Sequence, residues 1–232
     1  ALDTIGRDPL SEARDGTRIS LVGHGNGPPD VRITGGGGVS LSTAPDCVVR
    51  CLASVVSQLS AKTRKLGDVI ADDTAFPDQR WSPGMSWNNI GTDSGTAASA
   101  LVIDDNQLLL TVTPGKVGER PSVTVSPYFT VRNEAVTIAT GPDDLRVERA
   151  VNGRELRIFG KLAPGDKPWK DLIGIDDPAE YAAWALRQAL VAQGIKVSGG
   201  IKVRHRPVDL PGASPVSLPQ LPKAMQSVAF TA

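Results

Sequence analysis

The most restrictive feature of the sequence is a block between residues 100 and 162 in which short apolar runs alternate with turn residues. The runs are rich in Val, Leu, Ile and Thr, and they cover 100–104, 108–113, 122–126, 135–140, 145–150 and 155–162. Polar and apolar residues partly alternate around Thr137, Val147 and Ile158, which is typical of half-buried antiparallel strands. Gly (24) and Pro (18) together make up about 18% of the chain, against an average of about 12%, so many turns are expected. We therefore expect this block to form a small β-sheet domain of its own.

Before this block, the sequence predicts strands that alternate with a helix. Strands are expected at 18–23, 30–34 and 67–73, with Phe76 and Pro77 breaking the last one. The helix is expected to run from an N-cap at Thr43 to about Lys62. Its apolar residues recur at helical spacing, and they are Val48, Leu52, Val55, Val56 and Leu59.

A second helix is expected between Asp177 and Gly194. Asp177 suits the N-cap and Pro178 the first turn, while Gly194 suits the position just past the end of a helix. A strand, a turn and another strand should follow at 195–203.

Together these elements predict an α+β fold, a mixed α/β module with a nested small all-β domain. We expect residues 1–110 and 163–206 to form the α/β module, and residues 111–162 to form the nested β-sheet domain. Residues 207–232 contain five prolines and little periodicity, so a linker or the start of a further segment is expected there.

The charge and hydropathy of the chain exclude some classes of function. With 25 basic and 25 acidic residues, the chain has no net field to attract polyanions, so the sequence predicts no nucleic-acid partner. No window approaches the roughly 20 consecutive apolar residues that a transmembrane helix needs, so we expect no membrane span. The chain begins at Ala1 rather than Met, within what resembles a helix, and we expect it to be a piece of a longer protein.

The cysteines and histidines give little indication of a metal site. Cys47 and Cys51 stand four residues apart in the expected helix, where they share a face but are poorly placed for an unstrained disulfide. The simplest interpretation is a pair of small, semi-buried thiols. A metal ion would need two more ligands, and the only histidines, His24 and His205, are distant in sequence. The sequence predicts no metal and no cofactor.

The chain shows no complete set of catalytic residues. A serine nucleophile needs a base within hydrogen-bond reach, and neither histidine has a suitable setting. Arg204 and Arg206 flank His205 and should lower its pKa. The glycine run at 35–38 lacks the spacing of a P-loop or a dinucleotide site, so a tight loop is expected. We predict no catalytic residue in this chain.

Among the adjacent acidic pairs, Asp72 stands out as a candidate binding residue. Most such carboxylates cap helices, form turns or face solvent. Asp72 instead ends an apolar strand shortly before an aromatic loop at 81–89. We expect its side chain on the surface of a cleft beside this loop, where it could pair with a ligand ammonium group.

Several stretches also share the motifs of one family, in the same order. The stretch GDVIADDTAF at 67–76 matches Gly-Asp-Leu-Val-Val-Asp-Asp-Ser-x-Phe, and PGMSWNN at 83–89 matches Pro-Gly-Trp-x-Trp-x-Asp. Further matches lie at 1–6, 31–41, 106–115, 181–190 and 194–199. Over residues 1 to 206 the chain resembles the low-molecular-mass class C penicillin-binding proteins, which are D-alanyl-D-alanine carboxypeptidases and endopeptidases of bacterial peptidoglycan.

The resemblance implies that this chain is the part of such an enzyme inserted between its Ser-x-x-Lys and Ser-x-Asn motifs. Neither Ser-x-x-Lys nor Lys-Thr-Gly occurs here, and the only Ser-x-Asn begins at Ser86, away from the expected position. Residues 207–232 would then be a linker or the start of the missing catalytic domain. The whole protein would lie in the periplasm or cell envelope and bind peptidoglycan stem peptides and β-lactams through that domain.

By the same resemblance, Asp72 and Phe76 would bind the side-chain amine of the stem peptide. Core packing is an equally good interpretation of Phe76. For the chain as a whole, the alternative function is a stand-alone, non-catalytic module that binds the envelope or peptidoglycan, because a fold does not fix a function.

Overall fold

The computed structural model describes residues 16–23, 27–38, 41–165, 167–208, 218 and 224–228, and it divides into two compact units. Unit 1 contains the described residues of Ala1–Arg80, Ala98–Asp105 and Asp177–Ala232, and unit 2 contains Trp81–Ala97 and Asn106–Asp176. Unit 2 is therefore larger than the nested domain expected at 111–162. The physical reason is that 169–174, expected in the α/β module, pairs along its whole length with 107–113.

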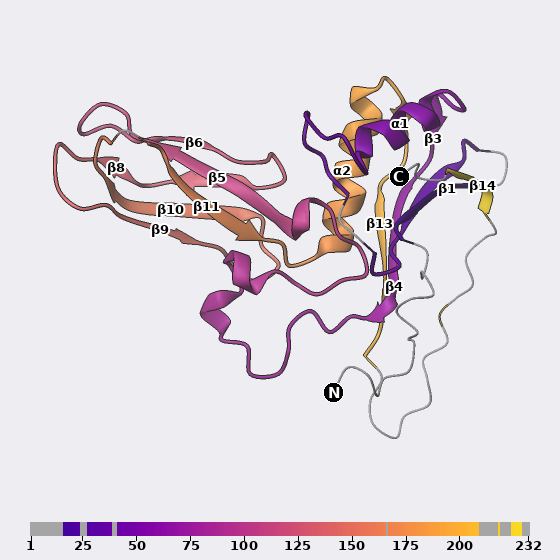
Figure 1. The fold of residues 1–232 in the computed structure, drawn as a ribbon, viewed down its shortest axis with the longest axis horizontal. Helices are drawn as coiled ribbons and strands as arrows, with labels where there is room; N and C mark the ends of the chain where they lie inside the picture. Colours follow the sequence, from indigo (N-terminus) through magenta and orange to yellow (C-terminus); the bar gives the residue numbers. More distant parts are fainter. Residues whose placement is uncertain are drawn as a thin grey trace. The chain divides into compact units, whose positions relative to one another are not determined.

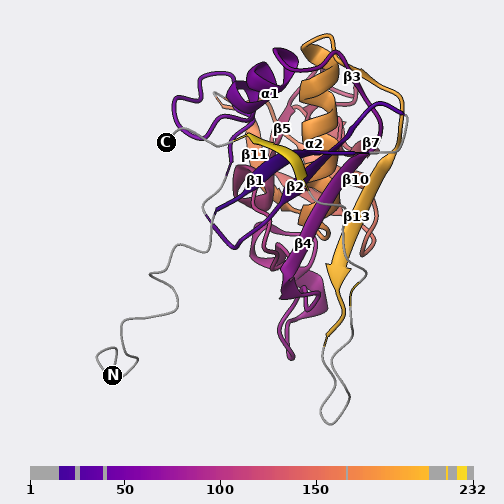
Figure 2. The same ribbon diagram turned by 90° about the vertical axis from the view of Figure 1, so that its right-hand side faces the viewer.

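Unit 1 is built on a five-stranded sheet in the order β13-β4-β2-β1-β14 (Figure 2). Its strands are β1 (Arg18–Val22), β2 (Asp30–Thr34), β4 (Val69–Pro77), β13 (Ile201–Arg206) and β14 (Ala224–Val228). β2, β4 and β13 run parallel to one another, whereas β1 is antiparallel to both of its neighbours. A short parallel pair, β3 (Lys65–Leu66) with β12 (Lys196–Val197), lies outside this sheet.

Residues 207–232 were expected to be a linker or the start of a further segment, and the described part of this range includes a strand. β14 lies in this segment and forms the outer strand of the sheet beside β1. Because β14 pairs with β1, the backbone groups on that side of β1 form hydrogen bonds within the sheet.

Two helices contribute to the core of unit 1, α1 (Leu52–Ser60) and α2 (Pro178–Ala192). Figure 1, in which the sheet is seen nearly edge-on, shows α2 on one side of β4 and β13, and α2 contacts both strands as well as α1. Alternate residues of the strands point to one face, so the cross-strand neighbours Ile33 and Ala71 are both fully buried. α2 is capped as predicted, because the Asp177 side chain accepts a hydrogen bond from the Glu180 N–H.

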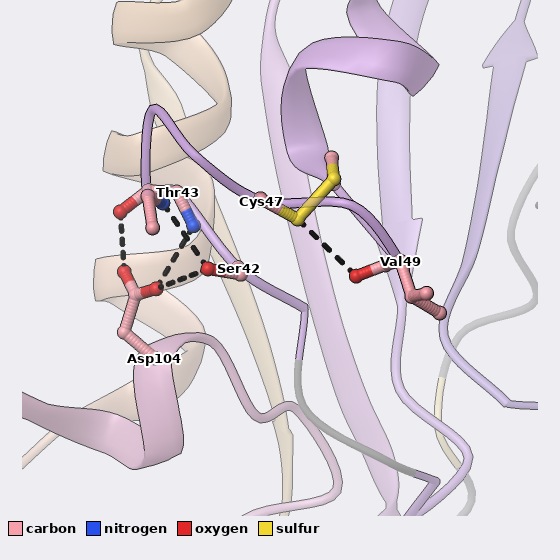
Figure 3. The surroundings of a disulfide bond; sticks show 7 residues. Ser42, Thr43, Cys47, Val49 and Asp104 are labelled. Carbon is pink, nitrogen blue, oxygen red and sulfur yellow. Dashed lines mark hydrogen bonds between the residues drawn. A yellow bond between two sulfur atoms is a disulfide. The ribbon is translucent and has the colours of Figure 1, made fainter.

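The first helix is shorter than predicted. α1 begins at Leu52 rather than after Thr43, and Arg50 has a left-handed backbone with φ of +58°. Cys47 and Cys51 form a disulfide with their Cα atoms 5.6 Å apart (Figure 3). The interpretation as two thiols on a helical face was wrong, since the chain between them forms a loop, in which this Cα separation suits a disulfide. Val48, expected on the apolar face of the helix, is 91% exposed.

Unit 2 consists of two small sheets and short 3-10 turns. One sheet is antiparallel, in the order β11 (Trp169–Gly174), β5 (Gln107–Thr113), β6 (Ser122–Thr124). In the other, β10 (Glu155–Leu162) pairs in parallel with β7 (Thr130–Asn133) and β8 (Val136–Thr137), and antiparallel with β9 (Asp144–Glu148). The 3-10 turns of this unit are η1 (Trp87–Asn89) and η2 (Asp93–Gly95). The expected β domain is present, although β7 and β11 were not predicted.

The strand expected at 100–104 does not form. In this stretch Ile103 makes a single bridge to Leu41, and η3 (Asp104–Asn106) follows. All three residues of η3 have positive φ, a conformation that Asp and Asn tolerate better than most residues. Over the described ranges, no helix combines the length and hydropathy needed to cross a bilayer.

Candidate functional site on beta4 and beta13

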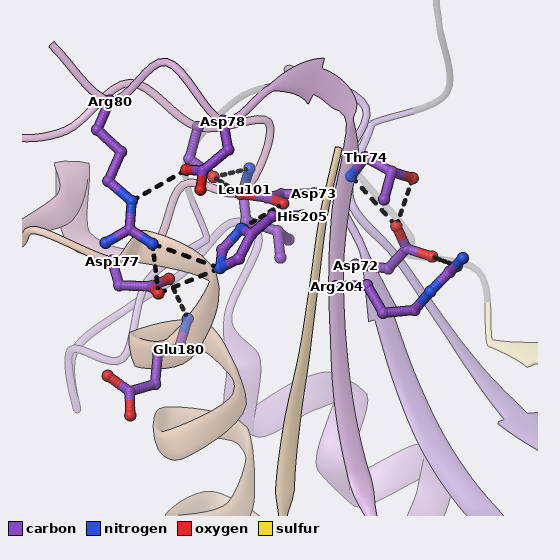
Figure 4. A network of polar contacts seen from close by, with 11 residues as sticks. Asp72, Asp73, Thr74, Asp78, Arg80, Leu101, Asp177, Glu180, Arg204 and His205 are labelled. Carbon is purple, nitrogen blue, oxygen red and sulfur yellow. Dashed lines mark hydrogen bonds and ion pairs between the residues drawn. The ribbon is translucent and has the colours of Figure 1, made fainter. Parts of the chain in front are cut away.

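Charged residues meet in the middle of β4 and near the end of its parallel neighbour β13. The expectation that Phe76 and Pro77 break the first of these strands was wrong, because β4 continues to Pro77. Arg204 lies opposite Asp72 in the strand register. Because successive residues of a strand point to opposite faces, Asp72 and Arg204 share one face, and Asp73 and His205 share the other (Figure 4). The adjacent carboxylates of β4 therefore belong to two separate groups of contacts.

His205 lies between two carboxylates. Its Nδ1 is 3.0 Å from Oδ1 of Asp73, and its Nε2 is 3.2 Å from Oδ2 of Asp177. Hydrogen bonds to Asp177 and Asp73 raise the pKa of His205 to about 10, although its partial burial acts in the opposite direction. The prediction of a lowered pKa was wrong, because two carboxylates face His205 directly, whereas Arg204 is paired with Asp72 on the opposite face. With this raised pKa, His205 carries a positive charge at neutral pH, and both of its ring nitrogens face carboxylates.

Asp177 connects this cluster to the beginning of α2. Besides capping the helix, it accepts a hydrogen bond of 2.9 Å from Nη2 of Arg80, whose Nε donates to Asp78 at 2.9 Å. Burial alone would raise the pKa of Asp177, but the hydrogen bonds from His205 and the Glu180 N–H and the nearby Arg80 charge lower it overall. Alternating charges thus join the middle of β4, the residues just after β4, the end of β13 and the first turn of α2.

The sequence had suggested that Asp72 lies on the surface of a cleft, but this expectation was wrong. It is 4% exposed, and Oδ2 accepts a hydrogen bond of 2.8 Å from Nη1 of Arg204. Oδ1 accepts from the hydroxyl of Thr74 at 2.6 Å and from its backbone N–H at 3.2 Å. The expectation failed because β13 pairs with β4 and supplies a cation. The loop at 81–89 belongs to unit 2, so its position beside Asp72 stays a prediction.

Phe76, in contrast, is accessible. It is 40% exposed, so it is not a core residue, and its ring lies against Gly37. A Cβ added to Gly37 would be 2.5 Å from Cζ of Phe76, and φ of Gly37 is +76°, so a glycine is required here. Position 35 also requires glycine, because a Cβ added to Gly35 would lie 2.2 Å from the carbonyl oxygen of Ala100. The glycine run makes close backbone and ring contacts, in agreement with the expected tight loop.

The cluster does not contain an activated serine. Ser99 reaches it, but its hydroxyl donates to Oδ2 of Asp73 at 3.0 Å rather than to His205. Both nitrogens of His205 already face carboxylates, so the imidazole is not placed to take the proton of Ser99. The predicted features at His24 and at residues 1–6 lie outside the described residues.

Sequence reasoning missed Arg80 and the second role of Asp177. The available signal was the occurrence of Asp-Asp at the end of one apolar strand and Arg-His-Arg in another. If these two strands were neighbours, the alternation of side chains would place one pair of unlike charges on each face of the sheet. The sequence does not show that the two strands pair.

Comparisons with known proteins agree with this fold. The family described as D-Ala-D-Ala carboxypeptidase 3 (S13) matches residues 2–218. A D-alanyl-D-alanine carboxypeptidase from Actinomadura sp. is 28% identical over 219 residues, which are 90% of this chain and 40% of that protein.

Two crystal structures of penicillin binding protein 4 from Haemophilus influenzae are similar in fold. One covers 84% of this chain and 45% of that chain, with 19% identity and a TM-score of 0.65. The other, complexed with a β-lactam, has a TM-score of 0.55 at 18% identity and covers 84% of this chain and 43% of that chain. The chain thus spans less than half the length of these relatives.

Proposed function

Because the chain belongs to the D-Ala-D-Ala carboxypeptidase 3 (S13) family, we propose that it supplies the non-catalytic inserted part of a serine-type D-alanyl-D-alanine carboxypeptidase or endopeptidase. The whole protein would act on peptidoglycan stem peptides and bind penicillin. The family match and the fold bear out the resemblance to class C penicillin-binding proteins. The observation that carries the proposal is a match over residues 2–218 that contains neither Ser-x-x-Lys nor Lys-Thr-Gly.

The chemistry of the described residues supports a non-catalytic role. The cluster of His205, Asp73 and Asp177 is a set of satisfied ion pairs, and Ser99 donates to a carboxylate rather than to a base. In this proposal, acylation takes place on a serine outside the 232 residues, and unit 1 and unit 2 support that domain.

The disulfide supports a location in the periplasm or the cell envelope. Disulfides persist in oxidising compartments and are rare in the cytosol, where thiols are kept reduced. Cys47 and Cys51 are bonded to each other, so they form a closed structural bridge rather than a metal site.

Phe76 and Asp72 are proposed to contact the stem peptide in different ways. Phe76 offers a partly exposed ring against which an alkyl side chain could pack. Both oxygens of Asp72 are already occupied, so the ammonium group of a ligand would have to compete with Arg204 for Oδ2. Because of this competition, we expect Asp72 to contribute less to binding of the ligand than a carboxylate with a free oxygen would.

Labelling with a fluorescent penicillin tests the proposed function. We expect the native full-length protein to form a stable covalent adduct and to release D-alanine from peptides that end in D-Ala-D-Ala. The 232-residue chain should form no adduct. An adduct on this chain would refute the non-catalytic assignment. A native protein that binds peptidoglycan fragments but neither labels nor cleaves would favour the binding-module alternative.

The substrate contacts are tested in the native protein with Asp72→Asn and Phe76→Ala, using stem peptides with and without a free side-chain amine. We expect each variant to lose activity mainly towards the amine-bearing peptide. Equal activity of Asp72→Asn and the native protein on both peptides would remove Asp72 from the binding site.

A further inference from the structure

Unit 2 contains a groove whose lining residues all belong to this unit. It lies between the segment 87–92 and the turn that follows β9, and its cavity volume is about 730 Å³. Ligand sites in proteins typically measure about 300–1,000 Å³, so the groove has the size for a ligand of several rings. Trp87, Asn88 and Ile90 line one side, and Val151, Arg154 and Glu155 line the other.

A buried ion pair holds both sides of this groove in place. The Arg149 side chain is 2% exposed and donates to the Asp176 carboxylate at 2.6 Å. Its guanidinium also donates to the carbonyl oxygen of Ile90 at 3.4 Å and to that of Gly153 at 3.2 Å. Ile90 belongs to one wall and Gly153 to the other, so one side chain ties the walls together. A groove fixed in this way needs little ordering when a ligand binds.

Trp87 is the most exposed large apolar residue of the groove. It is 82% exposed, and within the described residues its indole N–H has no hydrogen-bond partner. Asn88 uses its carbonyl oxygen to accept from Ser86, and its amide nitrogen has no partner in the described part of the chain. The Glu155 carboxylate is likewise without an ion pair among the residues that the structure describes. The groove therefore presents a flat apolar ring next to neutral donors and a carboxylate acceptor.

The charges around the groove compensate one another. Arg149 is paired with Asp176, and Arg157 is paired with Glu134 at 2.8 Å and with Glu148 at 3.3 Å. The guanidinium of Arg154 lies over the ring of Tyr128, 4.3 Å from its centroid, and its charge is opposite to that of Glu155 on the same side of the groove. The lining thus carries charges of both signs in nearly equal number, so no strong net charge selects an anionic or cationic polymer.

We propose that this groove binds an uncharged stretch of N-acetylated sugars, with the face of one sugar ring on Trp87. A sugar ring has an apolar face that can cover an exposed indole, and hydroxyl and acetamido groups that can bond to Asn88 and Glu155. The identification of the peptidoglycan glycan strand as the source of these sugars rests on the proposed function. The groove would then hold the glycan while the stem peptide is bound elsewhere in the protein.

Calorimetric titration of the 232-residue chain with a β-1,4-linked tetramer of N-acetylglucosamine tests this proposal. We expect saturable binding, a loss of about tenfold or more in affinity for Trp87→Ala, and a loss of about threefold or less for Trp87→Phe, which keeps a ring. The matched control is Leu109→Ala, an exposed apolar residue of the same unit that does not line the groove. It should bind like the native chain.

Three results would overturn the proposal: no binding of the tetramer, equal affinity of Trp87→Ala, or Trp87-dependent binding of a free acidic stem peptide in place of the tetramer. Circular dichroism of each variant shows whether the fold is retained. Penicillin labelling of the native protein is an independent measurement. If penicillin does not label the native protein but the chain still binds the sugar through Trp87, the proposed function is rejected and the groove assignment remains intact.

Discussion

Replacing His205 by Gln should remove a stabilising charge whose effect depends on pH. His205 joins β13 to Asp73 of β4 and to Asp177 at the start of α2, and its side chain is 24% exposed. Its pKa rises from 6.5, the value expected in the unfolded chain, to about 10 in the folded protein. The folded state therefore binds the proton more tightly. The resulting stability is complete below pH 6.5 and is lost as the pH rises through 10.

The size of the effect follows from the two pKa values. One pKa unit corresponds to about 1.4 kcal/mol, so linkage gives His205 an upper limit of about 4 kcal/mol at pH 7 and about 1 kcal/mol at pH 9. Partial exposure to solvent reduces both values. At pH 7 the Gln variant also leaves the buried Asp73 without its cation, whereas Asp177 keeps Arg80. A cost of about 3 kcal/mol at this pH is in the range for breaking a buried ion pair.

Urea unfolding at several pH values between 6 and 10 measures this effect. The difference in free energy of unfolding between the native chain and His205→Gln should fall by about 2 kcal/mol from pH 7 to pH 9. NMR titration gives a direct control: in His24→Gln, the single remaining imidazole is that of His205. A stability difference that does not change with pH, or a His205 imidazole that titrates near its ordinary pKa in the folded chain, would refute the reasoning.

Three further changes test other parts of the structure. Changing Cys47 and Cys51 together to Ser should lower the free energy of unfolding by about 2 kcal/mol. A reducing agent should lower the melting temperature of the native chain but not that of the variant, and an equal response of both chains would contradict a native disulfide. Arg149→Met should cost about 3–5 kcal/mol in urea unfolding, because it leaves the buried carboxylate of Asp176 without its cation, and a loss below 1 kcal/mol would show that the pair is solvated. Tyr181→Phe should cost about 1–2 kcal/mol, since the Tyr181 hydroxyl lies 3.0 Å from a carboxylate oxygen, and an unchanged stability would exclude that hydrogen bond.

The sequence by itself determined the elements whose signals are local. α2 has its cap, its proline and its terminal glycine within the helix or next to it, and these positions were predicted correctly. The strands at 30–34 and 155–162 were predicted with their observed bounds. A cap forms a hydrogen bond three residues away, and an apolar pattern repeats every two to four residues, so a short stretch of sequence contains the whole signal. The family motif at 67–76 is likewise contained in one short stretch of sequence.

Only the tertiary structure decided which charges meet. Asp72 with Arg204 and Asp73 with His205 are each 132 residues apart in sequence, and they come together because β13 pairs in parallel with β4. The pairing buries Asp72, which the sequence had placed on a surface, and it raises the pKa of His205, which the neighbouring arginines were expected to lower. The disulfide depended on the loop before α1, and the extent of unit 2 depended on the pairing of β11 with β5. In each case the stabilising free energy comes from contacts between segments that are distant in sequence. A local sequence pattern carries no information about which segments these are.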